Sequence, residues 1–207
     1  MNLFGGHAGL CYYPGYLDRD TQATLLAALE EVFAAAPPFT PRMPKSGRPF
    51  TVRMSNCGPL GWISDENGYR YERAHPVTGR PWPPMPRMLI AIWHDLADYP
   101  HAPEACLINF YGPAAKMGLH QDRDEQDFAA PVVSLSLGDS CLFRVGGLKR
   151  NDPTRSVRLN SRRVRVRRQR AACVPWSRPH LSGHIDLARW RRTDQSDHAA
   201  GETRKCW

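Results

Sequence analysis

The sequence predicts a mainly β protein, a sandwich or barrel of short strands with two helices as outer support. From residue 105 onward, short apolar runs alternate with Gly, Pro and Asp, which is typical of short strands joined by turns. Before residue 100, two longer segments instead repeat their apolar residues at helical spacing. At 207 residues the chain suits one domain with a sizeable core.

The first helix is predicted from Asp20 and Thr21, which can cap it, through Ala36, where two prolines follow and end it. Residues 37–60 are rich in Pro, Gly and basic groups. We therefore expect a loop there, followed by a short strand at 51–55.

A second helix is predicted over residues 86–97, and His94 within it is expected at the surface or partly buried rather than bound to a metal. Strands are predicted at 105–111, 132–137 and 141–145, because each is an apolar run bounded by turn residues. No internal repeat is visible.

The net charge of +8 belongs entirely to residues 161–207. This segment holds 12 of the 28 Lys and Arg but only 4 of the 20 Asp and Glu, so residues 1–160 are neutral. A nucleic-acid-binding role for the positive charge therefore depends on this segment alone. We expect a cytoplasmic protein without a membrane segment, because no apolar stretch approaches 18 residues and the six cysteines are scattered.

His120 and Asp122 are the best candidates for a metal site, since residues i and i+2 of an extended segment point to the same side. With a third ligand from elsewhere they would form the two-histidine, one-carboxylate set of non-heme iron(II) oxygenases. Alone, the tripeptide is a weak signal. A turn histidine beside a solvated acid is the alternative, because the neighbouring residues QDRDEQD are highly charged.

The sequence around this pair resembles that of the AlkB family of iron(II)/2-oxoglutarate-dependent dioxygenases, which remove alkyl groups from nucleic-acid bases. Six segments match in the family's order over residues 10–160: MSNCGPLGW, GYRY, RPWPPMP, NFYGPAAKMGLHQDRDE, PVVSLSLG and GGLKRNDP. The resemblance implies a double-stranded β-helix (jelly-roll) with a nucleotide-recognition region at 50–86 and a core at 105–160. It implies Fe(II), 2-oxoglutarate and O2 as cofactor and cosubstrates. It also implies a monomer acting on alkylated single- or double-stranded DNA, or on RNA.

The resemblance further implies a role for individual residues. His120 and Asp122 would bind iron. Trp62 and Tyr69 would contact and stack on a flipped-out base, with core packing as their alternative. The other implied contacts are Asn109 and Tyr111 to 2-oxoglutarate, and Arg70, Tyr71, Asp124 and Arg150 to the substrate.

Two of these substrate contacts carry a more specific expectation. Asp124 matches the family's base-recognising acid, and a carboxylate there would favour a cationic N-alkylated base. Arg150 matches a substrate-contacting arginine, and a contact to phosphate is its alternative.

The resemblance stops at Ser161. The family's second iron histidine, about 55 residues after His120, and its arginine-containing strand that binds 2-oxoglutarate are both missing. The reading frame can be shifted by taking bases two and three of each codon together with base one of the next codon. If the arginines have CGN codons, this shifted frame permits Asp-Val-Phe-Val-Phe-Gly-Gly at 162–168. The same frame permits a histidine at position 175 and Arg-Ile-Asn-Leu-Thr-Met-Arg at 193–199. We therefore interpret 161–207 as an aberrant, out-of-frame segment; a genuine basic nucleic-acid-binding tail is the alternative.

The predicted function is oxidative demethylation of N-alkylated bases in DNA, and in RNA, with the chain as written impaired by its lost ligands. The alternatives are the same chemistry on another class of substrate, and a non-catalytic nucleic-acid-binding protein that uses the basic tail. We also expect 161–207 not to complete the sheet, which would leave Val133, Leu135 and Leu137 uncovered and the chain poorly soluble.

Overall fold

Two helices and ten strands make up the regular structure of the residues that the computed structural model describes. These residues are 10–112, 115, 117, 127, 129–138, 141–145, 153–159, 163–167 and 184–189. The helices are α1 (Arg19–Ala35) and α2 (Arg87–Leu96). The strands are β1 (Leu10–Pro14), β2 (Val52–Cys57), β3 (Gly61–Asp65), β4 (Gly68–Glu72), β5 (Ala105–Tyr111), β6 (Val132–Ser136), β7 (Cys141–Val145), β8 (Arg155–Leu159), β9 (Arg163–Arg167) and β10 (His184–Arg189).

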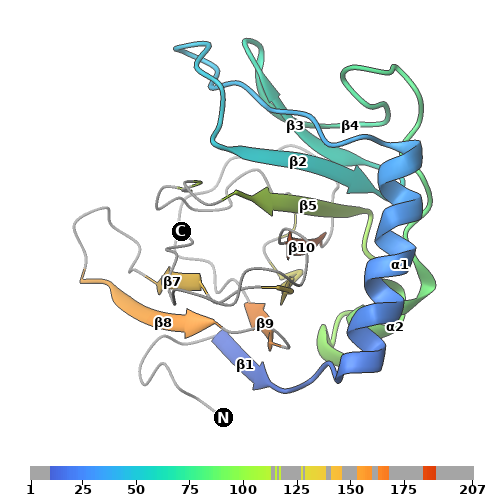
Figure 1. The fold of residues 1–207 in the computed structure, drawn as a ribbon, viewed down its shortest axis with the longest axis vertical. Coiled ribbons are helices and arrows are strands. Elements are labelled where there is room, and N and C mark those ends of the chain that lie inside the picture. The colour runs from blue at the N-terminus through green and yellow to red at the C-terminus, as the bar shows by residue number, and fades with distance from the viewer. Residues whose placement is uncertain are drawn as a thin grey trace, which may run out of the picture.

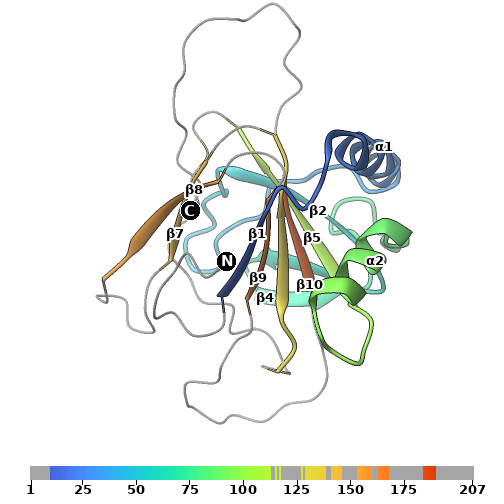
Figure 2. The same cartoon turned by 90° about the horizontal axis from the view of Figure 1, so that it is seen from below.

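One large sheet organises the molecule, with its strands in the order β1-β9-β6-β10-β5-β2. The remaining strands form two antiparallel pairs, β3–β4 and β7–β8. Both helices lie on one side of the large sheet, and the β7–β8 pair lies on the other (Figures 1 and 2). The mainly β fold with supporting helices is therefore confirmed, and two strand layers with helices outside are consistent with the predicted jelly-roll.

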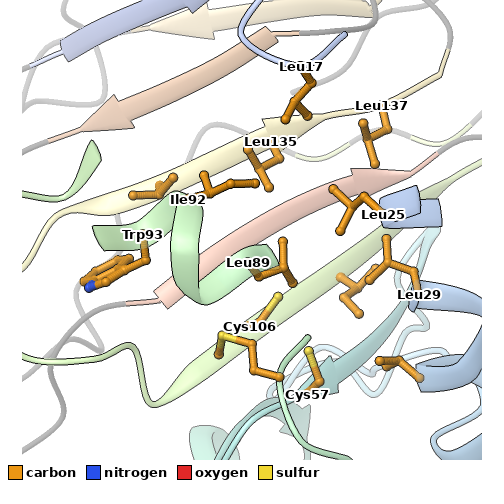
Figure 3. Packing of buried hydrophobic residues seen from close by; sticks show 14 of the residues in the cluster. Leu17, Leu25, Leu29, Cys57, Leu89, Ile92, Trp93, Cys106, Leu135 and Leu137 are labelled. Atoms are coloured by element: carbon orange, nitrogen blue, oxygen red, sulfur yellow. The ribbon is translucent and has the colours of Figure 1, made fainter. Parts of the chain in front are cut away.

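The face of the large sheet beneath the helices is its apolar core. Ile108 on β5 and Leu135 on β6 are both fully buried there. Alternate residues of each strand point to this same side of the sheet. They pack with Leu25 and Leu29 of α1 and Leu89 of α2 (Figure 3). We refer to this side as the outer face, and to the side toward β7–β8 as the inner face.

The helices form largely as the sequence predicts. α1 begins two residues earlier than expected, because the Thr21 amide donates to Asp18 Oδ1 at 2.7 Å and Asp18 rather than Asp20 is the N-cap. α2 falls within the predicted 86–97, and His94 is exposed, as expected. Among the described residues, no helix is long and apolar enough to cross a membrane.

Two segments of the basic region join the large sheet, so the expectation that 161–207 does not complete the sheet is wrong for them. β9 pairs antiparallel with β1 and β6, and β10 lies between β5 and β6. The RVRVR sequence of β9 has the two-residue period of a strand, which its high charge obscures. β10 runs parallel to both neighbours, whereas the other pairings in this sheet are antiparallel.

The expectation that β6 would be left uncovered is also wrong. Val133, Leu135 and Leu137 are buried on the outer face, where α1 and α2 cover them. The helices that cover them come from the first half of the chain.

Candidate active site

The inner face of β5 and β6 carries polar side chains where the outer face carries apolar ones. Asn109 on β5 is 1% exposed and Ser136 on β6 is 6% exposed. Both residues are in register with Ala188 of β10, so their side chains lie on the same side of the sheet. Their strands are two strand spacings apart, about 9–10 Å. Among the described residues Ser136 Oγ has no hydrogen-bond partner. A buried hydroxyl of this kind is usually satisfied, so it suits a polar ligand.

Tyr111 extends this face toward the loop that follows β5. It is opposite Val52 of β2, as Asn109 is opposite Met54, so both predicted cosubstrate residues lie on the inner face. The Tyr111 hydroxyl donates to Met117 Sδ at 3.7 Å. The ring packs in a small cluster around Val52, Met54 and Ala115 that also includes Trp62. This cluster connects the inner face to the β3–β4 hairpin.

The β3–β4 hairpin brings two predicted base-contacting residues together. The rings of Trp62 and Tyr69 are stacked, with centroids 5.6 Å apart and planes 18° from parallel. Phe50 meets Trp62 edge-on at 6.4 Å. Tyr69 is 47% exposed, so its ring is a surface feature rather than part of a closed core. Tyr71, also predicted to contact substrate, is opposite Trp62 in the hairpin.

Asn56 fixes the position of Trp62, a role that the sequence analysis missed. The Trp62 amide donates to Asn56 Oδ1 at 3.1 Å, and Asn56 Nδ2 donates to the Trp62 carbonyl at 3.0 Å. Asn56 is fully buried. Gly61 has to be a glycine, because a Cβ there would lie 2.4 Å from the Trp82 ring. An asparagine in a mostly buried strand was the available signal, since a buried amide needs partners.

Arg70 is engaged within the hairpin. Its Nη1 and Nη2 donate to Asp65 Oδ1 and Oδ2 at 2.7 and 2.8 Å, and its Nε donates to Glu72 Oε1 at 2.8 Å. The hydrogen bonds from Arg70 lower the pKa of Asp65 to about 2, and the two carboxylates raise the pKa of Arg70. Arg70 is predicted to contact the substrate, but its guanidinium already binds two side chains of the hairpin.

The predicted iron ligands His120 and Asp122, and the predicted substrate residues Asp124 and Arg150, lie outside the described residues. Within the described part of the chain, no group of three His, Cys, Asp or Glu residues could hold a metal.

Asp127, which follows the predicted iron ligands in the sequence, is held by two hydrogen bonds. Tyr99 Oη donates to Asp127 Oδ2 at 2.5 Å and the Ala129 amide donates to Asp127 Oδ1 at 2.8 Å. The Tyr99 hydrogen bond, followed by that of the Ala129 amide, lowers the pKa of Asp127. Asp127, shortly before β6, is therefore tied to the loop after α2.

Comparisons with known proteins identify the family to which this chain is similar. The sequence profile of the 2OG-Fe(II) oxygenase superfamily matches residues 9–168. A Caulobacter vibrioides protein named alpha-ketoglutarate-dependent dioxygenase AlkB homolog is 50% identical over 155 residues, which cover 74% of this chain and 69% of that protein. The Escherichia coli alpha-ketoglutarate-dependent dioxygenase AlkB is 46% identical over 134 residues, or 61% of this chain and 60% of that protein. The solved structure of OsALKBH1 is similar, with a TM-score of 0.64 and 26% identity over 76% of this chain and 79% of that chain.

Proposed function

Because this chain belongs to the 2OG-Fe(II) oxygenase superfamily, we propose that it oxidatively removes alkyl groups from base nitrogens in DNA, with RNA as a second substrate. The observation that carries the proposal is the exposed Trp62–Tyr69 stack beside the polar inner face. We propose further that the protein acts as a monomer in the cytoplasm.

The stacked pair supports a nucleic-acid base as substrate. Aromatic side chains bind extruded or single-stranded bases through their faces, at about 1–3 kcal/mol per stacked base. Tyr69 is about half exposed, and Trp62 connects its ring to the cluster containing Tyr111. A base held by this pair therefore lies close to the face that carries Asn109.

The inner face fits an acidic cosubstrate. Asn109, Tyr111 and Ser136 provide amide and hydroxyl groups on one side of β5 and β6, and the buried Ser136 hydroxyl can donate to a carboxylate. His120 and Asp122 are the residues that we propose hold Fe(II). Bound Fe(II), with 2-oxoglutarate and O2, supplies the oxidation of the alkyl carbon. A methyl group oxidised in this way leaves the base nitrogen as formaldehyde.

The substrate residues outside the described part of the chain complete the proposal. Asp124 is proposed to favour the cationic form of an N-alkylated base through charge attraction. Arg150 is proposed to contact the substrate, as a base contact or as a phosphate contact.

We propose that residues 161–207 are the out-of-frame remnant of the strands that complete the site. The parallel position of β10 supports this, because jelly-roll sheets are antiparallel and the gap between β5 and β6 calls for an antiparallel strand. The chain as written would then lack one iron ligand and the cosubstrate arginines. Nucleotide sequence across codons 155–170 tests this directly: a single-base change of frame is expected, and an uninterrupted frame shared by independent isolates would refute it.

Formaldehyde release tests the proposed function. We define the restored chain as residues 1–160 followed by the alternative frame of 161–207. With Fe(II) and 2-oxoglutarate, we expect it to release formaldehyde from single-stranded DNA containing N1-methyladenine or N3-methylcytosine, and the chain as written to release far less. Asp122→Ala in the restored chain should abolish release, because a single histidine holds iron poorly. Asp20→Ala, on the exposed surface of α1, is the matched control and should leave release unchanged.

Two other outcomes would replace the proposal. Turnover of 2-oxoglutarate without any dependence on methylated nucleic acid would indicate another class of substrate. A chain that never releases formaldehyde, but binds nucleic acid in a steeply salt-dependent way that is lost when 161–207 is removed, would be a non-catalytic binding protein.

A further inference from the structure

The β3–β4 hairpin contains a cluster of three charged side chains, Asp65, Arg70 and Glu72, which we call the hairpin ion-pair cluster. Arg70 binds Asp65 through two parallel hydrogen bonds across the strands and Glu72 through its Nε. The side chains of Arg70 and Asp65 are 33% and 37% exposed. A two-pronged guanidinium–carboxylate pair fixes orientation as well as distance, since both groups are planar.

The hairpin ion-pair cluster lies on the opposite face of the hairpin from the aromatic stack. Arg70 is in register with Ile63, whereas Trp62 is opposite Tyr71 and Tyr69 is opposite Ser64. Alternate residues of a strand point to opposite sides, so Arg70 and Tyr69 point apart. The Arg70 guanidinium is therefore directed away from the surface on which Trp62 and Tyr69 present their rings.

The two ends of the hairpin are held by different contacts. At the open end, Asn56 binds the Trp62 backbone, and Trp82 Nε1 donates to the Glu72 carbonyl at 2.9 Å. At the turn, Glu66 and Asn67 are exposed, and Asp65 Oδ1 accepts from the Asn67 amide at 2.8 Å. Asp65 and Arg70 flank this turn, next to Ser64 and Tyr69 respectively. The ion pair thus links the two strands close to Tyr69.

We propose that Arg70 is a positioning residue, which holds Tyr69 against Trp62 from the opposite face of the hairpin and does not itself contact nucleic acid. The inference rests on the proposed function, in which the stack binds a base. A partly exposed ion pair contributes little to global stability, so its loss loosens the hairpin without unfolding the chain.

A direct phosphate contact by Arg70 makes the opposite prediction for Asp65. Removing a negative charge beside a phosphate-binding arginine strengthens nucleic-acid binding, because the net attraction to the backbone grows. Removing the carboxylate that holds Arg70 in place weakens binding, because the stack is no longer fixed. The sign of the change in affinity for Asp65→Asn therefore separates the two roles.

The first measurement needs no nucleic acid and uses the full chain. Tyr69→Ala defines the part of the near-ultraviolet circular dichroism that comes from the stacked pair. Asp65→Asn, Arg70→Met and Arg70→Lys should each lose most of that signal, since lysine keeps the charge but not the two-pronged contact. Arg73→Met, an exposed arginine just after β4, removes the same charge and should keep the signal. Retention of the signal in Asp65→Asn and Arg70→Met would overturn the proposal.

The second measurement is the affinity for a fluorescein-labelled single-stranded oligonucleotide with one N1-methyladenine, read by anisotropy. Asp65→Asn and Arg70→Lys should each weaken binding by up to about tenfold, equivalent to about 1.4 kcal/mol. Tighter binding by Asp65→Asn, or unchanged binding by Arg70→Lys, would overturn the positioning role. If the restored chain without any substitution shows no preference for the methylated oligonucleotide, the proposed function fails, while the circular dichroism still decides how the hairpin ion-pair cluster acts on the stack.

Discussion

Ile108 and Asn109 are neighbours on β5, yet they lie on opposite faces of the large sheet and in different environments. Ile108 is buried among Leu25, Leu89 and Leu135 beneath the two helices. Asn109 is equally buried, but on the inner face with Tyr111. The outer side of β5 therefore stabilises the fold, and its inner side carries residues of the proposed active site. Burial alone does not distinguish a core residue from a site residue; the polarity of the face does.

The largest expected effect is on the outer face. Leu135→Ala should lower the free energy of unfolding by about 2–5 kcal/mol, because it leaves a cavity among fully buried side chains. Urea denaturation of the full chain measures this change. A loss below about 1 kcal/mol would show that the outer face is not the main source of stability. Leu26→Ala, a partly buried residue of α1 at the edge of the same cluster, is the control and should lose less.

An intermediate effect is expected at Asn56, where a buried polar group positions a site residue. Asn56→Ala removes both hydrogen bonds to the Trp62 backbone, and it should cost about 1–3 kcal/mol of stability. The same variant should weaken binding of the methylated oligonucleotide, because Trp62 loses its support. Thermal unfolding and anisotropy report the two effects separately. Stability loss with unchanged affinity would make Asn56 a core residue only.

The smallest expected effect is at the hydrogen bond between Asp127 and Tyr99, which lies in the loop after α2. Because this hydrogen bond holds the pKa of folded Asp127 below its usual value of about 4, its stabilisation is present above that pH and is lost as the pH falls through the folded value. Asp127→Asn should therefore cost about 1 kcal/mol at pH 7 and less at a pH below that usual value. Urea denaturation at the two pH values tests the sign. A cost that grows toward low pH would contradict this account.

The sequence predicted the outer face better than the site. β5, β6 and β7 were found because each is an apolar run bounded by turn residues, and α2 because its apolar residues recur at helical spacing. β9 was missed because three arginines obscured its two-residue period. The N-cap was misplaced by two residues because Asp18 and Asp20 are chemically equal candidates.

Contacts that depend on strand register could not be predicted. Asp65 and Arg70 meet because the hairpin turns between them, and Asn56 meets Trp62 because β2 and β3 lie side by side. The residues Trp62, Tyr69, Asn109 and Tyr111 were found through family resemblance, and their functional roles remain proposals. Register and turn geometry decide which polar groups face one another, and neither follows from composition.

The most direct test compares the two neighbours on β5 in the restored chain. Asn109→Leu has similar volume but no amide, so it should abolish most 2-oxoglutarate-dependent formaldehyde release while changing the free energy of unfolding by about 1 kcal/mol or less. Ile108→Ala should lower the free energy of unfolding by about 2–5 kcal/mol, yet leave formaldehyde release per folded molecule unchanged. Both quantities are measured on the same samples. Loss of stability and activity in equal proportion in both variants would contradict the division of β5 into a stabilising face and a chemical face.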